Sequence, residues 1–266
     1  MPRTARFCSL FSGSSGNCTY ISSGDSGILI DAGVSAKRIR DALAAREVDL
    51  SSIRGIFVTH EHSDHIAGVR VLAKQCGCPV YASKGTLLGM DKAHALPETE
   101  IFALGAGESV AVGDLQISAF ATPHDTPEST GYAVETADGT KLAVATDMGE
   151  LLKPVFDILC GCDVVLLESN HDVAMLRSGP YPPFLQERIL GRRGHLSNAA
   201  CAAALPALVS AGVSRVMLGH LSDKNNTPSL AYDTACTALR EAGITVDRDM
   251  RLSVAARVSD EAILRV

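Results

Sequence analysis

The chain lacks the long apolar runs and the cysteine density that mark membrane proteins and disulfide-bonded secreted domains. No apolar run among its 266 residues approaches the ~20 residues of a membrane-spanning helix. Residues 1–7 lack the apolar core of a secretory signal. Eight cysteines are too sparse for a disulfide scaffold, so we expect free thiols. These absences predict a cytoplasmic protein without membrane contact and leave its oligomeric state open.

The chain also has no excess of basic over acidic residues. The formal net charge of −6 argues against a broad basic face for nucleic acid. A local basic site remains compatible with this total, because bound metal ions add positive charge that it does not count. Arg188, Arg192 and Arg193 form one local basic cluster. Such a cluster is suited to backbone phosphates, although many charge runs are only solvated faces.

No internal repeat or linker stands out, and strand-rich blocks alternate with helical patterns through both halves of the chain. We therefore expect one domain over residues 1–266, of the α/β (α+β) class, in which two sheets with helices outside form a four-layer αββα sandwich. An antiparallel meander is expected between residues 101 and 147. The main helices are expected at 36–45, 66–75, 84–94, 198–211 and 228–242.

Four candidate metal ligands fall within six residues, directly after the apolar run 56–58. His60 and His62 are two positions apart, so in extended backbone they point to the same side. Asp64 and His65 follow as the chain turns towards a helical pattern. Imidazole and carboxylate together suit zinc, manganese or iron. The spacing favours a metal site over the alternative, a polar loop with incidental histidines.

Further candidate ligands follow other apolar strands. His124, Asp147 and His220 each stand at such a strand end. Asp31 also ends an apolar run, and two interpretations are open for it. It can cap the helix expected after Ser35, or its carboxylate can orient a metal-bound histidine.

The H-x-H-x-D-H string of residues 60–65 resembles the signature of the metallo-β-lactamase fold superfamily. The resemblance implies two divalent ions, zinc or manganese with iron also compatible, which share one bridging carboxylate and activate a hydroxide for hydrolysis. It also implies the orienting role for Asp31, and His62 stands where flavodiiron relatives carry a glutamate, which disfavours redox use. The implied assignment is His60, His62 and His124 on one ion, Asp64, His65 and His220 on the other, and Asp147 between them.

Glu168 and His195 resemble a pair in the RNase Z-like nucleases. There, a glutamate-assisted histidine binds the phosphodiester or protonates the leaving 3′-oxygen. The alternatives are a loop or helix cap for Glu168 and a surface histidine for His195. The expected catalytic residues are therefore His195 and Glu168, together with Asp64 of the ligand set. His94 and His171 are expected to lie outside that set.

The resemblance is closer still to the bacterial YycJ-type exonucleases and spans nearly the whole chain. It implies a metal-dependent phosphodiesterase, a cytoplasmic 5′→3′ DNA exonuclease, with DNA preferred over RNA. The large insertion of the β-CASP nucleases is absent from the sequence. Two alternatives remain: a small-molecule hydrolase for a thioester, lactone or cyclic phosphodiester, and a binding module without turnover. The matching segments are residues 12–17, 168–172, 179–182, 194–198 and 219–226.

Overall fold

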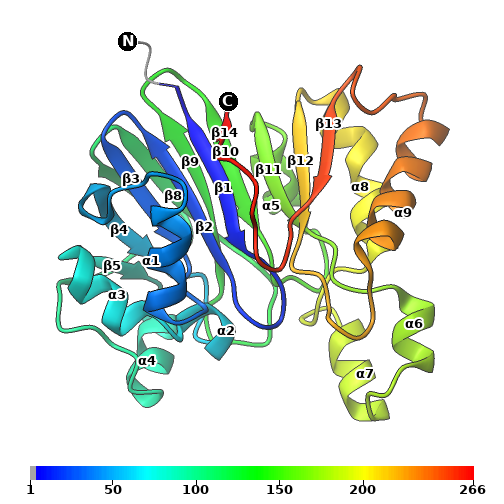
Figure 1. Ribbon diagram of the computed structural model, residues 1–266. Helices are drawn as coiled ribbons and strands as arrows, with labels where there is room; N and C mark the ends of the chain where they lie inside the picture. The colour runs from blue at the N-terminus through cyan, green and yellow to red at the C-terminus, as the bar shows by residue number, and fades with distance from the viewer. Residues whose placement is uncertain (1–3) are drawn as a thin grey trace. The chain divides into compact units, whose positions relative to one another are not determined.

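The computed structural model describes residues 4–266 and divides into two compact units (Figure 1). Met1–Arg3, part of the N-terminal stretch inspected for a secretory signal, lie outside the described residues. The first unit runs to residue 121 and adds residues 126–140 and 256–266, and the second unit comprises residues 122–125 and 141–255. The single-domain organisation over 1–266 stays a prediction.

The first unit contains a seven-stranded sheet whose order is β14-β1-β2-β3-β4-β5-β6. Its first three strands along the chain pair antiparallel, and β3, β4, β5 and β6 then pair parallel. The strand bounds are β1 Arg6–Phe11, β2 Cys18–Ser23, β3 Ser26–Ile30, β4 Ile53–Phe57, β5 Val80–Ala82, β6 Ile101–Ala103 and β14 Leu264–Arg265. Because β3 and β4 run parallel, the residues that follow them, including Asp31 and the histidine-rich loop, emerge at one edge of the sheet.

The helices of the first unit include α1 (Ala36–Ala44), α3 (Val69–Cys76) and α4 (Lys84–Lys92). The helix expected over 66–75 is interrupted, because α2 (Ser63–Ile66) ends before α3 begins. Gly68 causes the break: its N–H donates to Ala32 O, and an added Cβ would lie 2.2 Å from Val34 O. A tertiary contact therefore overrides the helical pattern at this point.

The meander expected over 101–147 is only partly present. β7 (Ser109–Val112), β8 (Leu115–Ala121) and β9 (Thr130–Thr136) form an antiparallel ladder in the first unit. β6, however, pairs parallel with β5, and β10 (Lys141–Ala145) pairs parallel with β11 (Val164–Glu168). The prediction was wrong for β6, because local turn signals do not reveal which distant strand supplies the hydrogen bonds.

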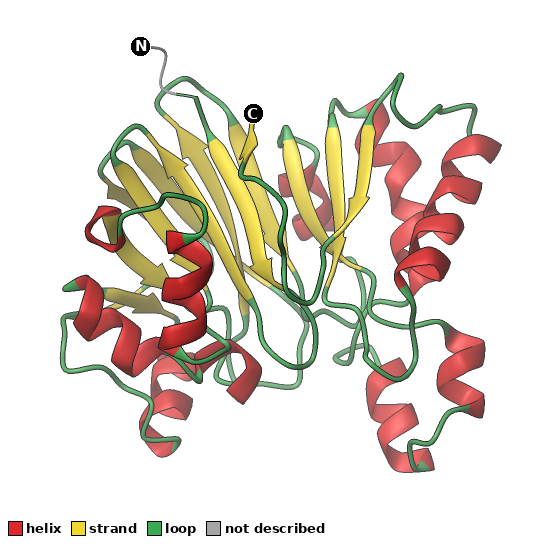
Figure 2. Ribbon diagram, in the orientation of Figure 1, coloured by secondary structure: helices red, strands yellow, loops and turns green. Residues whose placement is uncertain are grey.

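The second unit contains four parallel strands, β10, β11, β12 (Arg215–Gly219) and β13 (Arg251–Val254). Two of its helices, α8 (Asn198–Ser210) and α9 (Pro228–Glu241), pack side by side (Figure 2). Ser197 caps α8, as predicted. The shorter helices are α5 (Lys153–Leu159), α6 (Val173–Ser178) and α7 (Pro183–Leu190). Parallel strands bring their carboxyl ends to one edge, which gathers the polar residues that follow β10, β11 and β12.

All eight cysteines lie among the described residues and are free, as predicted. Within residues 4–266, no helix combines the length and the apolar character needed to cross a bilayer.

Candidate metal centre

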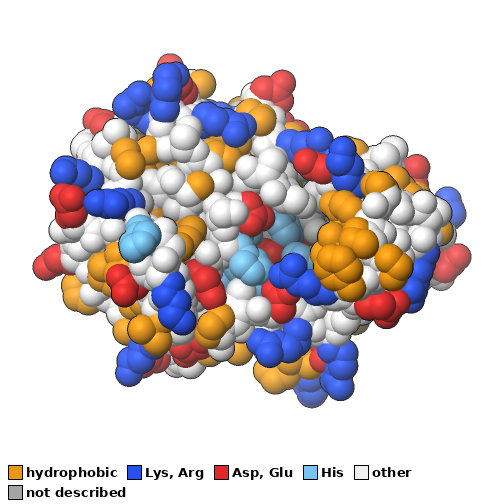
Figure 3. All heavy atoms as spheres, turned by 90° about the horizontal axis from the view of Figure 1, so that it is seen from below, with side chains coloured by type: hydrophobic (Ala, Val, Ile, Leu, Met, Phe, Trp, Pro, Cys, Tyr) orange, Lys and Arg blue, Asp and Glu red, His pale blue; other side chains and the backbone are white. Residues whose placement is uncertain are grey.

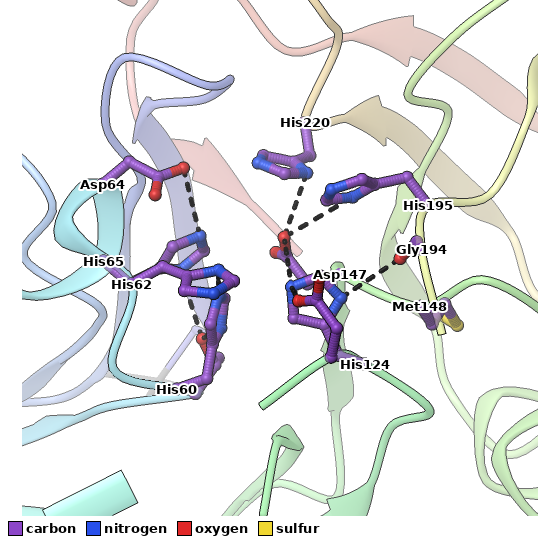
Figure 4. Close-up of polar contacts among 12 residues, drawn as sticks. His60, His62, Asp64, His65, His124, Asp147, Met148, Gly194, His195 and His220 are labelled. Atoms are coloured by element: carbon purple, nitrogen blue, oxygen red, sulfur yellow. Dashed lines mark hydrogen bonds and ion pairs between the residues drawn. The ribbon is translucent and has the colours of Figure 1, made fainter. Parts of the chain in front are cut away.

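The histidine-rich loop of the first unit brings imidazole nitrogens together. His60 Nε2 lies 3.0 Å from His62 Nδ1, and the rings of His60 and His65 are 4.0 Å apart between centroids (Figure 4). Two nitrogens at the usual zinc distance of about 2.0–2.1 Å stand about 3.3 Å apart in a tetrahedral site. The observed separation between the nitrogens of His60 and His62 is therefore suited to joint ligation of one divalent ion.

Asp31 fixes the orientation of His65. Its Oδ2 lies 2.8 Å from His65 Nδ1, and its Oδ1 accepts a 2.8 Å hydrogen bond from the N–H of Thr59. Ser35, not Asp31, caps α1, so the capping interpretation of Asp31 was wrong. With Nδ1 of His65 directed at a buried carboxylate, Nε2 is the nitrogen suited to a metal, and it lies 3.5 Å from Asp64 Oδ2.

We expect Asp31→Asn to weaken divalent-metal binding about 10- to 100-fold, because the amide lacks the charge that favours a donating His65 Nδ1. Asparagine tolerates the left-handed backbone of Asp31, so the change isolates the charge. Competition against a chromophoric chelator measures the affinity. Asp49→Asn, at an exposed carboxylate of the same unit, is the control, and equal affinities for both variants would contradict the orienting role.

Asn17 is a residue of this loop region that sequence reasoning did not assign to the site. Its N–H donates to Asp64 O over 2.8 Å, and its Nδ2 lies 3.1 Å from His65 Nε2. Its own carbonyl accepts from Gly33 N. The small-residue segment 12–17 therefore ends on an asparagine that supports the histidine-rich loop. The turn cluster was visible in the sequence, but its partner 47 residues away was not.

The second unit holds a group of ligand atoms around Asp147. One atom each from Asp147, Glu168, His195 and His220 lies within 4.8 Å of the others. Asp147 Oδ1 is 3.4 Å from His220 Nδ1, 3.7 Å from His195 Nδ1 and 3.8 Å from His124 Nε2 (Figure 4). His124 Nδ1 donates to Gly194 O over 3.1 Å, which directs its Nε2 towards Asp147. The predicted residues of this unit therefore converge on one buried carboxylate.

Glu168 connects two of these histidines to the backbone. Its Oε1 lies 2.8 Å from both His195 Nδ1 and His220 Nδ1. Its Oε2 accepts from the N–H groups of Met148 and Leu196, at 2.9 and 3.0 Å. Burial alone would raise the pKa of Glu168, but the two histidines and their hydrogen bonds hold it well below its ordinary value. Glu168 is thus a buried carboxylate that positions histidines rather than a helix cap.

Glu168→Gln should lower the free energy of unfolding by about 3–5 kcal/mol. The carboxylate only accepts hydrogen bonds, so an amide NH₂ would face two donors and lose both bonds in a buried site. Chemical denaturation measures the change. Glu187→Gln, whose parent pairs with Arg177 on the surface, is the control and should stay within about 0.5 kcal/mol of the parent protein. Similar values for the two variants would rule out this structural role.

The remaining histidines differ in their surroundings. Burial lowers the pKa of His124, and burial lowers the pKa of His171 to about 4. A neutral imidazole is the form that binds metals, which suits His124 as a ligand. His171 is buried and lies outside the groups of potential ligand atoms among the described residues, and His94 is exposed.

Three of the candidate residues share an unusual backbone conformation. Asp31, Asp147 and His220 have φ values of 63°, 57° and 55°. Each follows a β-strand by one or two positions. The left-handed conformation turns the chain sharply at the strand end, and residues other than glycine adopt it at an energetic cost.

Comparison with known proteins identifies the class to which this arrangement belongs. The family described as "Beta-lactamase superfamily domain" matches residues 27–221, a range that includes both Asp31 and His220. The chain therefore belongs to the β-lactamase superfamily. The solved metallo-β-lactamase fold protein YhfI from Bacillus subtilis superposes with a TM-score of 0.73 at 16% identity, covering 99% of this chain and 100% of the other. The predicted fold class, an α/β metallo-β-lactamase fold of the αββα type, is confirmed.

Two curated relatives are similar over almost their full length. The chain is 36% identical over 241 residues to the exodeoxyribonuclease YycJ of Bacillus anthracis, covering 90% of this chain and 91% of the relative. It is 35% identical over 252 residues to the exodeoxyribonuclease WalJ of Streptococcus pneumoniae serotype 2 strain D39, covering 93% of each. The resemblance to the YycJ-type family drawn from the motifs is thereby confirmed.

Proposed function

We propose that the chain is a metal-dependent phosphodiesterase that degrades DNA from its end, most specifically a 5′→3′ exodeoxyribonuclease. The observation that carries the proposal is the identity of 35–36% to two exodeoxyribonucleases across at least 90% of this chain and of each relative. The Glu168–His195 pair, a positioned acid–base group beside candidate metal ligands, supports phosphodiester chemistry. The 5′→3′ polarity and the preference for DNA over RNA rest on the family resemblance.

The proposed cofactors are two divalent ions, zinc or manganese. The proposed ligand set is the one inferred from the sequence, and the local geometry of each unit supports its own part of that set. Imidazole and carboxylate donors without a thiolate suit either ion. Bound ions would lower the pKa of water and stabilise negative charge on phosphoryl oxygens. The ligands would be His60, His62, Asp64, His65, His124, Asp147 and His220.

His195 is the proposed general acid. Its Nδ1 is held 2.8 Å from Glu168 Oε1, so Nε2 is the nitrogen directed away from the carboxylate. Its side chain is 21% exposed, whereas Glu168 is fully buried. A partly exposed, oriented imidazole can donate a proton to the departing 3′-oxygen while the carboxylate stabilises its charge. Glu168 would act by positioning His195 and His220.

The test is digestion of substrates that separate the alternatives. The purified protein, supplied with Mn²⁺ or Zn²⁺, is incubated with single-stranded DNA labelled at either end, with matched RNA, and with a nitrophenyl phosphodiester. We expect mononucleotides to be released from DNA in order from the 5′ end, and a chelator to stop the reaction. Cleavage of the nitrophenyl ester alone would contradict the proposal in favour of a small-molecule hydrolase.

A further inference from the structure

Helix α7 is unusual because none of its eight residues is fully buried. Phe184, in its first turn, is 75% exposed. Leu185, Ile189 and Leu190 are only partly buried. Figure 3, which looks onto the face that carries α6 and α7, shows a gathering of hydrophobic side chains with both basic and acidic side chains around it. An exposed aromatic ring next to cationic side chains is a combination that proteins use to hold single-stranded nucleic acid.

The segment that contains α7 is rich in arginine, although the whole chain is acidic. Residues 177–193 contain four arginines and one acidic residue, Glu187, whereas the full sequence carries a net charge of −6. The side chains of Arg177, Arg188 and Arg192 are 54%, 55% and 82% exposed. Arg188 pairs with Asp125 and Arg192 with Glu150. The two arginines are exposed, whereas the side chains of Asp125 and Glu150 are only 24% and 34% exposed, so a phosphate can approach each guanidinium from its open side without displacing the carboxylate.

The C-terminal end of α7 is joined directly to candidate catalytic residues of the same unit. His195 N donates to Ile189 O over 2.9 Å, and Gly194 N donates to Gly191 O over 2.8 Å. Arg193 Nε donates to the carbonyl of His124 over 2.6 Å. Phe184 precedes Leu190 by six residues, which is about 9 Å along a helix axis. A single DNA strand that lies along α7 would therefore lead from Phe184 towards His195.

We propose that α7 is a docking surface for the single-stranded DNA that adjoins the cleaved nucleotide. Phe184 stacks against a base, and Arg188 and Arg192 contact the phosphates. The occupant is inferred from the side chains themselves, because exposed guanidinium groups of Arg188 and Arg192 can contact phosphates and the flat face of a base matches the exposed ring of Phe184. This inference rests on the proposed function, since it names the part of a DNA substrate that α7 holds.

The test measures binding separately from cleavage. Fluorescence anisotropy follows a labelled, phosphorothioate-linked oligo-dT, which resists hydrolysis. Phe184→Ala should bind about 5- to 150-fold more weakly, the range expected for loss of one stacked base, and Phe184→Trp should bind like the parent protein. Leu88→Ala is the matched control, because Leu88 is 64% exposed on α4 of the first unit, and it should leave binding unchanged.

An oligonucleotide of abasic residues with the same backbone isolates the stacking contact. The parent and Phe184→Ala should bind this strand equally. Equal binding of oligo-dT by the two proteins, or an undiminished difference on the abasic strand, would overturn the inference. A change in elution volume on gel filtration without a change in DNA affinity would also overturn it, in favour of an interface between two copies of the chain.

Separate measurements of binding and cleavage distinguish the docking role of α7 from the nuclease activity. Phe184→Ala should hydrolyse a nitrophenyl phosphodiester at the parent rate, because that substrate does not reach along α7. A parent protein that binds oligo-dT through Phe184 but cleaves no DNA would contradict the nuclease proposal and retain the docking surface. A parent protein that cleaves DNA while Phe184→Ala binds and cleaves normally would do the reverse.

Discussion

Asp147→Asn is expected to lower the metal content below two ions per chain and to reduce DNA hydrolysis about 10³-fold or more. Asp147 Oδ1 lies within 3.8 Å of a nitrogen of His124, His195 and His220, so it is the carboxylate on which the second unit converges. A neutral amide is a poor bridging ligand. The charge stabilisation that paired ions provide is worth several kcal/mol, and each 1.36 kcal/mol changes the rate about tenfold.

Metal analysis by mass spectrometry and turnover of labelled DNA measure these two effects. Asparagine accepts the φ of 57° at this position, so the backbone should be retained, and circular dichroism checks this. Asp157→Asn is the control, because Asp157 is an exposed carboxylate paired with Lys153 on α5. Two ions per chain and unchanged turnover in Asp147→Asn would disprove the dinuclear proposal.

His195→Ala should keep the metal stoichiometry of the parent protein and lose about 10²- to 10⁴-fold in DNA cleavage, the usual effect of removing a general acid. The imidazole is held by Glu168 and is 21% exposed, so its loss leaves the buried carboxylate with its other three hydrogen bonds. The loss should be smaller on a nitrophenyl phosphodiester, because that leaving group departs without a proton.

The pattern of rates separates three roles for His195. An equal loss on both substrates would assign the imidazole to phosphate binding instead of proton transfer. A loss of metal would make it a ligand and overturn the proposed ligand set. His94→Ala, at an exposed histidine of the first unit, should behave like the parent protein in every assay and controls for the removal of an imidazole.

The parts of the candidate site that follow strands could be predicted because two local signals coincide there. An apolar run predicts a buried strand, and a histidine or carboxylate after it predicts a polar group at the sheet edge. His60 and His62 after β4, Asp147 after β10 and His220 after β12 all follow this rule. The carboxyl ends of parallel strands meet at one edge, so separate segments deliver their side chains to the same region.

The parts that were missed depend on tertiary contacts or on weak local signals. Asn17 supports the histidine-rich loop across 47 residues of sequence. Gly68 divides a helical pattern because another loop packs against it. Helix α7 was not predicted, because it has only eight residues and begins among Pro180, Pro182 and Pro183, which are typical of a turn or loop. Its lack of fully buried residues makes it a candidate for contact with DNA.

The left-handed conformations of Asp31, Asp147 and His220 lower the stability of the folded protein at three residues of the proposed metal site. A non-glycine residue in this conformation costs on the order of 1 kcal/mol, and folded domains have only about 5–15 kcal/mol in total. Glycine would relieve the cost at each position but would remove a side chain of the proposed metal site. At these three strand ends, the residue that is best for stability differs from the residue that is best for the proposed activity. Selection for heat resistance alone would therefore favour replacing these residues before residues of the surrounding sheet.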